Sequence, residues 1–279
     1  MVPDTTPPLR PVAAKEPLFT YLRQMWDRRD FATALPMEEV RARHQDTLLG
    51  NLWHITNPLL TVGVYYIIFG VILNASRGVD NYLLWLTVGV FSYNLTSKTV
   101  LSGAQAITSN EGLIRAVQFP RALLPVSVAF SHVITFWFEL LMLAALSVIM
   151  GLYPNPRWLA IPVFLAIHSA FNVGAAMIVA RLNDGFRDVA QIVPFLFRLG
   201  TYASGVMFPI DKISDRVSGP LLWIAILNPF ANFMALYRWS FLDTPITGRT
   251  VAICSAWACV TLVWGFRFFR RAELRFGRG

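Results

Sequence analysis

Polar and aromatic side chains recur at helical spacing within three apolar segments of the sequence. Steps of three and four residues place such side chains on one face of a helix. The stripes are Thr87, Phe91, Asn94, Lys98, Ser102 and Gln105 in one segment, His132, Phe136 and Glu139 in the next, and Gln191, Phe195, Arg198 and Tyr202 in a third. This pairing suits a sugar, because hydroxyls need hydrogen-bond partners while the C–H faces of the sugar stack on rings.

Ionisable side chains within a membrane are costly, and they mark either a pathway or a packed polar contact. The stripes therefore predict a channel, with interhelical hydrogen bonding in a tight bundle as the alternative for any single residue. The candidate channel residues are Phe91, Asn94, Lys98, His132, Phe136, Glu139, Phe195, Arg198 and Tyr202.

The sequence holds no motif for a metal or a nucleotide. It contains no Cys-x-x-Cys or His-Glu-x-x-His, and no glycine is followed by Lys-Ser or Lys-Thr. We therefore predict no metal site, no catalytic residue and no phosphate-cradling loop in this chain. Cys254 and Cys259 lie in the last apolar run, and we interpret both as small core residues.

The elements that carry these stripes belong to a membrane protein. The chain has 279 residues, of which 55% are hydrophobic and 14% charged, and its mean hydropathy is +0.51. A soluble chain carries roughly a quarter charged residues, so we predict an all-α integral membrane fold. The apolar runs lie at about 53–73, 82–106, 121–150, 158–180, 189–209, 220–242 and 250–269.

Seven membrane spans would not agree with the charge distribution. Lysine and arginine are concentrated before the first run and after the last one, so both termini should be cytoplasmic and the number of spans even. Asn228-Pro229 interrupts the run at 220–242, and Arg238 lies within it. We therefore predict six transmembrane helices, with 220–242 as an outer re-entrant hairpin between spans five and six.

The sequence also predicts how the chain is divided. Residues 1–17 are Pro-rich and predict a disordered cytoplasmic tail. Residues 18–52 mix aromatic residues with arginines and predict an amphipathic segment at the membrane interface, with a small soluble hairpin as the alternative. Residues 53–270 form the membrane domain, and 271–279 form a cytoplasmic tail.

Six stretches, in order along the chain, resemble one family: the permease subunits of ABC-2 type transporters that export polysaccharides. They are 48–60, 109–127, 182–195, 205–210, 226–242 and 266–277. The similarity is closest to exporters of O-antigen, teichoic acid and actinobacterial galactan. The bias of 21 arginines against three lysines favours the galactan exporter.

The resemblance implies a homodimer of this chain, in the cytoplasmic membrane, on two separate ATPase subunits that bind ATP and Mg. The substrate would be a lipid-linked polysaccharide, and no nucleic-acid partner is expected. The segment at about 108–120 would be the coupling helix that docks on the ATPase, with a plain connecting turn as the alternative. Leu113, Ile114 and Val117 would anchor in a pocket of the ATPase, and Asn110, Glu111, Arg115 and Arg121 would begin the helix and fix its register.

The loop at 181–188 would be a second contact with the ATPase, through Arg187 and Asp188. A self-paired, solvated charge cluster is the alternative for this loop.

Depth along the helices assigns roles to the buried charges. At about 1.5 Å per residue, Lys98 and Arg198 lie about 14 Å above the inner ends of their spans, and Glu139 about 27 Å above its own. We therefore expect no ion pair with Glu139. The two cations would meet the pyrophosphate of the lipid-linked glycan, while Glu139 binds sugar hydroxyls or lies near a gate.

Three other classes compete with this reading. A drug or small-lipid efflux permease of the same family is the first. A membrane glycosyl or acyl transferase would need clustered carboxylates or histidines, whereas the outer loops hold only scattered aspartates. A secondary transporter would need acidic residues near the midplane, where Glu139 stands alone.

Overall fold

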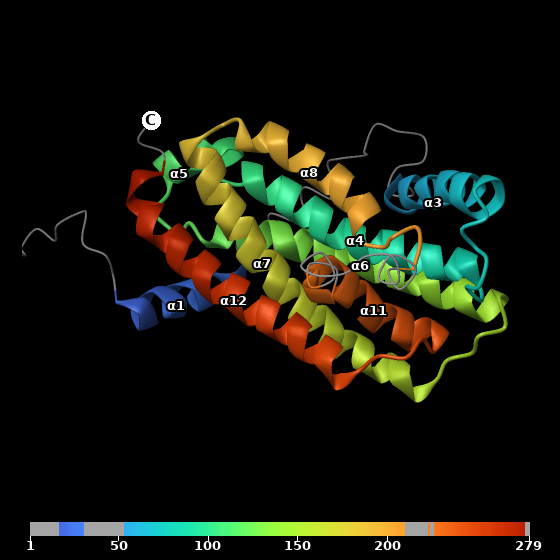
Figure 1. Ribbon diagram of the computed structural model, residues 1–279. Helices are drawn as coiled ribbons and strands as arrows, with labels where there is room; N and C mark the ends of the chain where they lie inside the picture. Colours follow the sequence, from blue (N-terminus) through green and yellow to red (C-terminus); the bar gives the residue numbers. More distant parts are fainter. Residues whose placement is uncertain (1–16, 31–52, 210–222, 224–225, 277–279) are drawn as a thin grey trace, which may run out of the picture.

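The computed structural model describes residues 17–30, 53–209, 223 and 226–276. Within these ranges the regular elements are all helices, arranged as one elongated bundle (Figure 1). Several predicted segments lie wholly or partly outside the described residues: residues 1–16 of the tail predicted at 1–17, residues 31–52 of the interface segment predicted at 18–52, most of the first half of the hairpin, and residues 277–279.

Long helices build the bundle. They are α3 (Trp53–Tyr65), which continues as the π-helical η2 (Tyr66–Ile72), α4 (Tyr82–Gln105), α6 (Leu123–Ile149), α7 (Ile161–Gly185), α8 (Val189–Ala203), α11 (Pro229–Leu242) and α12 (Gly248–Ala272). Short elements lie at the two ends: α1 (Leu18–Asp27), η3 (Thr108–Asn110), α5 (Glu111–Ala116), η4 (Pro156–Ala160) and η5 (Glu273–Arg275).

Three of these helices have the length and apolar composition to cross a bilayer: α6, the η4–α7 segment Pro156–Gly185, and α12. A shorter apolar helix runs over Thr56–Ile72. A helix coincides with each of the six predicted spans. The predicted all-α membrane fold is therefore confirmed, whereas the number of crossings stays a prediction.

Helices α7 and α12 make the most extensive helix–helix contact among the described residues. A methyl group added at Gly174 would meet the backbone of Thr261, and one added at Gly265 would meet the carbonyl of Gly174. Helix α4 approaches α7 in the same way, since a Cβ at Gly103 would lie 2.6 Å from the Cβ of Ala176. Small residues thus allow close backbone contact, as is usual between membrane helices.

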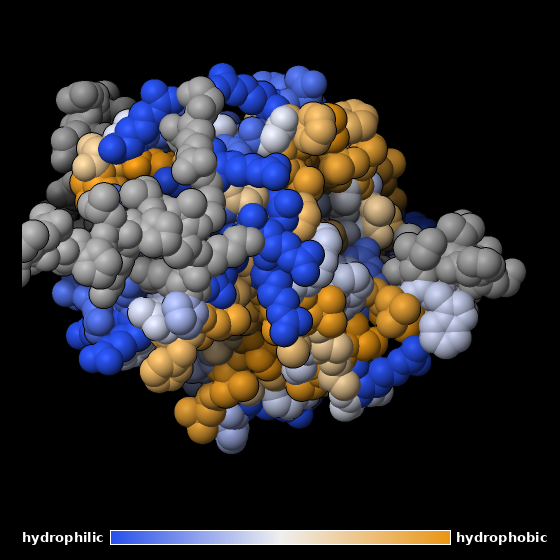
Figure 2. All heavy atoms as spheres, turned by 90° about the vertical axis from the view of Figure 1, so that its left-hand side faces the viewer, coloured by the Kyte–Doolittle hydropathy of each residue, from blue (hydrophilic) through white to orange (hydrophobic). Residues whose placement is uncertain are grey.

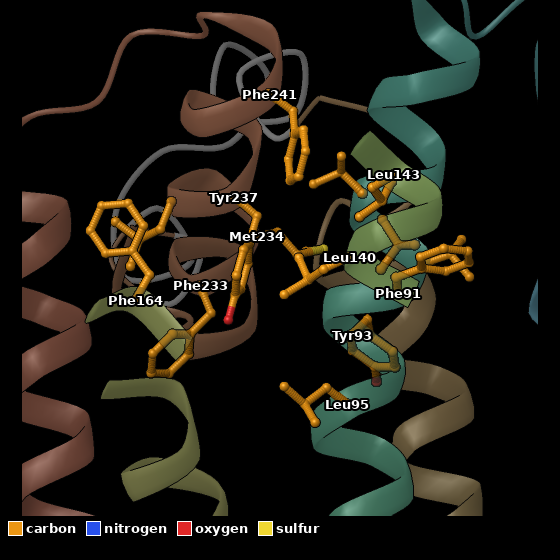
Figure 3. Packing of buried hydrophobic residues seen from close by; sticks show 14 of the residues in the cluster. Phe91, Tyr93, Leu95, Leu140, Leu143, Phe164, Phe233, Met234, Tyr237 and Phe241 are labelled. Carbon is orange, nitrogen blue, oxygen red and sulfur yellow. The ribbon is translucent and has the colours of Figure 1, made fainter. Parts of the chain in front are cut away.

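A large apolar cluster fills the bundle between α4, α6, α7 and α11, away from the end that carries α5 (Figure 3). Phe91, Leu140, Phe233 and Tyr237 are among its members. A smaller cluster lies at the other end and brings Tyr21 of α1 together with Ile114, Phe269 and Phe276.

Span five is shorter than predicted. Helix α8 ends at Ala203, whereas the apolar run extends to residue 209. The backbone leaves the helix where Gly205 adopts a positive φ of 71°. Arg238 of α11 donates to the carbonyl oxygens of Gly205 at 3.2 Å and Val206 at 3.3 Å, and Tyr82 donates to that of Met207 at 2.7 Å. These bonds replace helical ones in a buried segment.

The predicted break at Asn228-Pro229 is the beginning of α11. The Asn228 side chain accepts from the backbone N–H of Phe230 at 3.0 Å, and proline occupies the first turn. The Trp257 indole of α12 donates to Leu227 O at 2.9 Å. Because Trp257 lies well inside α12, α11 begins at depth in the bundle, as the second half of a re-entrant hairpin would.

The opposite end of α11 lies at the loop between α6 and α7, where Asp243 forms an ion pair with Arg157. Of the two cysteines predicted to be core residues, Cys254 is buried and Cys259 is exposed. They differ because residues five positions apart lie on different faces of a helix.

Candidate functional site

The end of the bundle that carries α5 and η5 is hydrophilic. Figure 2 views this end, where hydrophilic residues run across the surface and apolar residues flank them. Glu111 lies at the centre of the contacts between the two predicted docking loops. One of its oxygens lies 3.6 Å from Arg115, and the other lies 3.5 Å from Arg187. The structure therefore joins the loops at 108–121 and 181–188 into one surface.

Side-chain bonds to the backbone fix both loops. The Asn110 amide donates to Ala106 O at 2.9 Å. Buried Asn183 accepts from Ala190 N at 3.0 Å, which satisfies one of the unpaired N–H groups at the start of α8. Asp188 occupies the residue before α8 but makes no side-chain capping bond. The α7–α8 connection is thus held by Asn183, which the sequence analysis did not select.

Two of the predicted docking residues face the chain itself. Ile114 is 6% exposed and belongs to the apolar cluster with Tyr21 and Phe269, and Leu113 packs against that cluster. A helix of six residues has only one apolar face, and α5 turns this face onto its own bundle. The prediction that Ile114 anchors in an ATPase pocket is therefore wrong for this conformation.

Arg121 also has partners within the chain. Its guanidinium donates to Glu273 O and to Phe276 O, the latter at 2.7 Å. Arg121 therefore fixes the C-terminal end of the chain rather than presenting a free charge to another subunit.

Exposed apolar side chains at this end include Val117, which was predicted, and Phe186, which was not. Phe186 is 73% exposed and lies next to Arg187 in the α7–α8 connection. An exposed phenylalanine beside paired charges is typical of an interface anchor. Its position between an Asp-Gly and an Arg-Asp pair was the signal available in the sequence.

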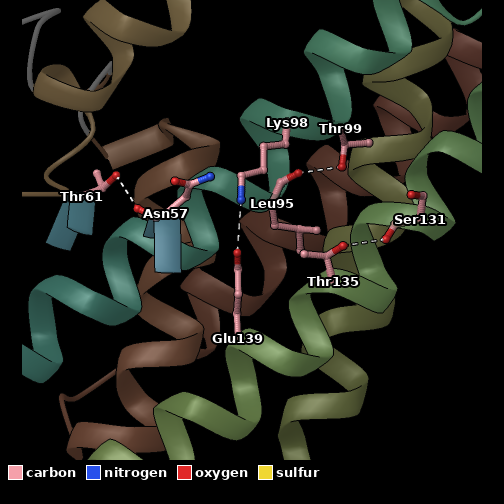
Figure 4. A network of polar contacts seen from close by, with 8 residues as sticks. All are labelled: Asn57, Thr61, Leu95, Lys98, Thr99, Ser131, Thr135 and Glu139. Atoms are coloured by element: carbon pink, nitrogen blue, oxygen red, sulfur yellow. Dashed lines mark hydrogen bonds and ion pairs between the residues drawn. The ribbon is translucent and has the colours of Figure 1, made fainter. Parts of the chain in front are cut away.

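The second candidate region contains a polar contact between α4 and α6 (Figure 4). Lys98 Nζ lies 3.2 Å from Glu139 Oε1, and the carboxylate side chain is only 4% exposed, against 40% for the lysine. The expectation that Glu139 has no ion pair is therefore wrong.

The reason lies in the register of the two helices. His132 and Ser102 are in contact at 3.0 Å, so these two residues share one depth. From there, four residues up α4 reach Lys98 and seven up α6 reach Glu139, a difference of about 5 Å at 1.5 Å per residue. Two long side chains cover this gap. The predicted depths assumed that α4 ends and α6 begins at one level, whereas the start of α6 extends beyond the end of α4.

The aromatic residues of these stripes are core residues. Phe91 and Phe136 are at most 1% exposed, and Phe136 packs edge-to-face on Tyr237 with ring centroids 5.4 Å apart. The prediction that they line a channel does not hold within this chain, because α11 fills the space beside them (Figure 3). Asn94 is partly exposed, and His132 is buried against Ser102.

The stripe on α8 faces outward. Phe195 and Tyr202 are exposed, and Arg198 is exposed without an ion pair or hydrogen bond to any other described residue. On the opposite face, Tyr93 of α4 donates to Phe197 O at 2.6 Å. The three predicted stripes therefore do not surround one channel within a single chain.

A bundle of apolar helices with a paired-loop surface at one hydrophilic end defines a multi-pass membrane protein. The sequence profile of the ABC-2 type transporter family matches residues 33–242, and the chain belongs to this family. The predicted family is confirmed.

Three relatives cover nearly the whole chain. The chain is 28% identical over 243 residues to the O-antigen export system permease protein RfbA of Myxococcus xanthus, covering 87% of this chain and 92% of that protein. It is 25% identical to a protein of the same name from Klebsiella pneumoniae, with 88% and 93% covered. It is 22% identical to the polysialic acid transport protein KpsM of Escherichia coli, with 86% and 92% covered.

Proposed function

We propose that this chain is the transmembrane permease of an ATP-driven exporter that carries a lipid-linked polysaccharide across the cytoplasmic membrane. The observation that carries the proposal is the full-length similarity to permeases named for O-antigen export and to a polysialic acid transport protein. The polar surface at one end of a strongly apolar bundle supports it, since a transport subunit must meet a soluble partner there.

The ATPase would dock on the surface that Glu111 joins. The proposed assembly is a homodimer of this chain on two ATPase subunits, which hold ATP and Mg. Phe186 and Val117 replace Ile114 as apolar anchors, and Arg115, Glu111 and Arg187 set the register. Paired charges around exposed apolar anchors fit a groove on a globular partner.

Co-purification of the permease with its ATPase tests this surface. Truncation of an interface anchor typically costs about 2 kcal/mol, so Phe186→Ala should weaken binding about thirtyfold at 1.4 kcal/mol per factor of ten. Tyr153→Ala is the matched control, because Tyr153 is equally exposed at the other end of the bundle. Equal ATPase recovery with both variants would contradict docking through Phe186.

The anionic end of the substrate would contact Arg198, and the Lys98–Glu139 pair would hold α4 against α6. Arg198 is exposed on α8 between Phe195 and Tyr202, a cation between two rings. Arginine recognises phosphate through paired hydrogen bonds. Because this stripe faces away from the rest of the chain, the substrate path would run along α8 and be closed by a second copy.

The proposed topology has six spans, cytoplasmic termini and a re-entrant hairpin that ends in α11. Single cysteines at positions 215 and 246, introduced after replacement of Cys254 and Cys259, should both react with an impermeant reagent from outside. Reaction from opposite sides would contradict the hairpin and make the number of spans odd.

A further inference from the structure

Tyr21, Arg121 and Glu273 lie together although they are distant in the sequence. The Tyr21 hydroxyl donates to Glu273 Oε1 at 2.6 Å, and the backbone N–H of Arg121 donates to the same oxygen at 2.8 Å. The Tyr21 hydroxyl in turn accepts a hydrogen bond from the backbone N–H of Ala122 at 3.3 Å. Three segments of the chain thus meet at one carboxylate: α1, the segment that follows α5, and η5.

A second contact joins the same segments. The Arg28 guanidinium, just after α1, donates to Gln118 O. Helix α1 and the residue after it therefore contact the segment 117–122 near both ends of that segment, at Gln118 and at Ala122. This segment is the exit of the predicted docking loop and leads directly into α6.

The surroundings of Glu273 keep it in this geometry. The Arg270 guanidinium lies over the Tyr21 ring at 5.1 Å from its centroid, and the Phe266 ring packs against Tyr21 at 6.0 Å. Burial raises the pKa of the Glu273 carboxyl, whereas the bonds from Tyr21 and Arg121 act in the opposite direction. A partly buried carboxyl with two donors is costly to free, because it would leave polar groups unpaired.

The outer face of α1 is apolar. Leu18, Phe19, Leu22 and Trp26 are exposed, while Tyr21 on the opposite face is buried. Figure 1 shows α1 lying beside α12 at the end of the bundle that carries α5. A helix with an exposed apolar face at this level rests in the boundary of the inner leaflet, so any movement transmitted to α1 reaches the membrane surface.

We infer that Glu273 is a positioning residue that links the ATPase-docking loop to α1 and to the end of α12, so that α1 moves on the membrane surface when the docking loop moves. The inference rests on the proposed function, because it requires the 108–121 loop to follow the ATPase. The carboxylate is the shared acceptor of the bonds from Tyr21 and Arg121, so its loss weakens the link between α1 and the docking loop without altering either element's exposed surface.

The test uses the complex of the full chain with its ATPase in lipid vesicles. A nitroxide at position 23, which is exposed on α1, reports oxygen accessibility with and without trapped ATP. Mutations within a coupled network weaken coupling without abolishing it, so Glu273→Ala should lower export per ATP hydrolysed about tenfold. The ATP-dependent change in accessibility should disappear, while ATPase binding persists.

Tyr21→Phe should act on the same link. Combined with Glu273→Ala, it should add little to the loss of export per ATP, because both remove one interaction. Asp27→Asn is the control, since Asp27 belongs to an exposed ion pair on the same helix. It should behave as the wild type.

The outcomes separate this inference from the proposed function. A retained accessibility change and a normal export-to-ATP ratio in Glu273→Ala, with the ATPase bound, would overturn the link. Equal losses of export and folded protein would also overturn it, because they would show a structural role alone. Failure of the proposed function would instead appear in the wild type, as a chain that neither binds the ATPase nor exports a lipid-linked polysaccharide.

Discussion

The contact between α7 and α12 and the surface formed by α3 and α8 are opposites within one bundle. At the first, glycine backbones touch, and no side chain separates Gly174 from Thr261 or Gly265. At the second, large side chains such as Leu60, Val71, Phe195 and Leu199 are exposed. The α7–α12 contact is therefore closed within this chain, whereas the surface of α3 and α8 leaves large apolar side chains uncovered.

The same division explains the charges. Lys98 and Glu139 satisfy each other where α4 and α6 pack, whereas Arg198 on α8 has no partner among the described residues. Lys98 and Arg198, for which the sequence predicted the same role, therefore lie in different surroundings. The first belongs to the packing of α4 against α6, and the second lies on an exposed surface of α8.

The largest expected effect is at the α7–α12 contact. A Cβ at position 174 would meet backbone atoms of Thr261, which cannot rotate away. Overpacking of this kind costs about 3 kcal/mol or more, so Gly174→Ala should strongly lower the melting temperature or prevent folding. Gly63→Ala in α3 is the control, because nothing lies within 4 Å of an added Cβ. Equal melting temperatures for the two variants would show that the two regions do not differ in how tightly they are packed.

The next effect is at the ion pair. Lys98→Gln leaves the Glu139 carboxylate buried without its cation. Removing one partner of a fully buried pair costs about 3 to 5 kcal/mol. Since the Lys98 side chain is 40% exposed, we expect about 2 kcal/mol, measured as a loss of thermal stability in detergent. Glu139→Gln should cost less, because it leaves only a half-exposed lysine. An unchanged melting temperature with lost export would instead give Lys98 a role toward the substrate.

Arg198→Gln should show the reverse pattern. Its side chain is exposed, so thermal stability should stay unchanged within error. The loss of a charge-assisted hydrogen bond to phosphate is worth about 1.5 to 3 kcal/mol, so export should fall at least about tenfold. Arg198→Lys should recover only part of the export, since lysine lacks the paired donors. A drop in stability together with normal export would show that Arg198 instead supports the packing of the bundle.

The smallest effect is the pH dependence at Glu273, outside the spans. Burial raises the pKa of this carboxyl in the folded protein above its usual 4.5. The folded state therefore binds the proton more tightly than the unfolded state. This adds stability that is fully present below about pH 4.5 and is lost as the pH rises through the pKa of the folded state. Glu273→Gln should remove this part of the slope. Identical slopes for both proteins would show that the carboxyl titrates normally.

Helix positions were predictable because they depend on local composition. Apolar runs of about 20 residues specify membrane helices whatever their neighbours are, and each predicted span coincides with a helix. The start of α11 was also predictable, since Asn228 and Pro229 favour a helix N-terminus through local backbone geometry. Full-length motif similarity likewise sufficed for the family.

The partners of side chains were not predictable, since they depend on how one helix is displaced along another. A shift of α6 by a few residues relative to α4 brings Glu139 to Lys98, and no periodicity within either helix encodes this shift. The rotation of α5 likewise buries Ile114, while Val117 and Phe186 are exposed.

By itself, the sequence determined that this is a helical membrane protein of the ABC-2 type transporter family, because hydropathy and motif order are properties of the chain alone. Only the tertiary structure decided that Lys98 is paired while Arg198 has no partner among the described residues, and that Glu273 joins α1 to the segment that follows α5. These are contacts between residues 41 to 252 positions apart, and they exist only once the packing of small residues has set the register of the helices.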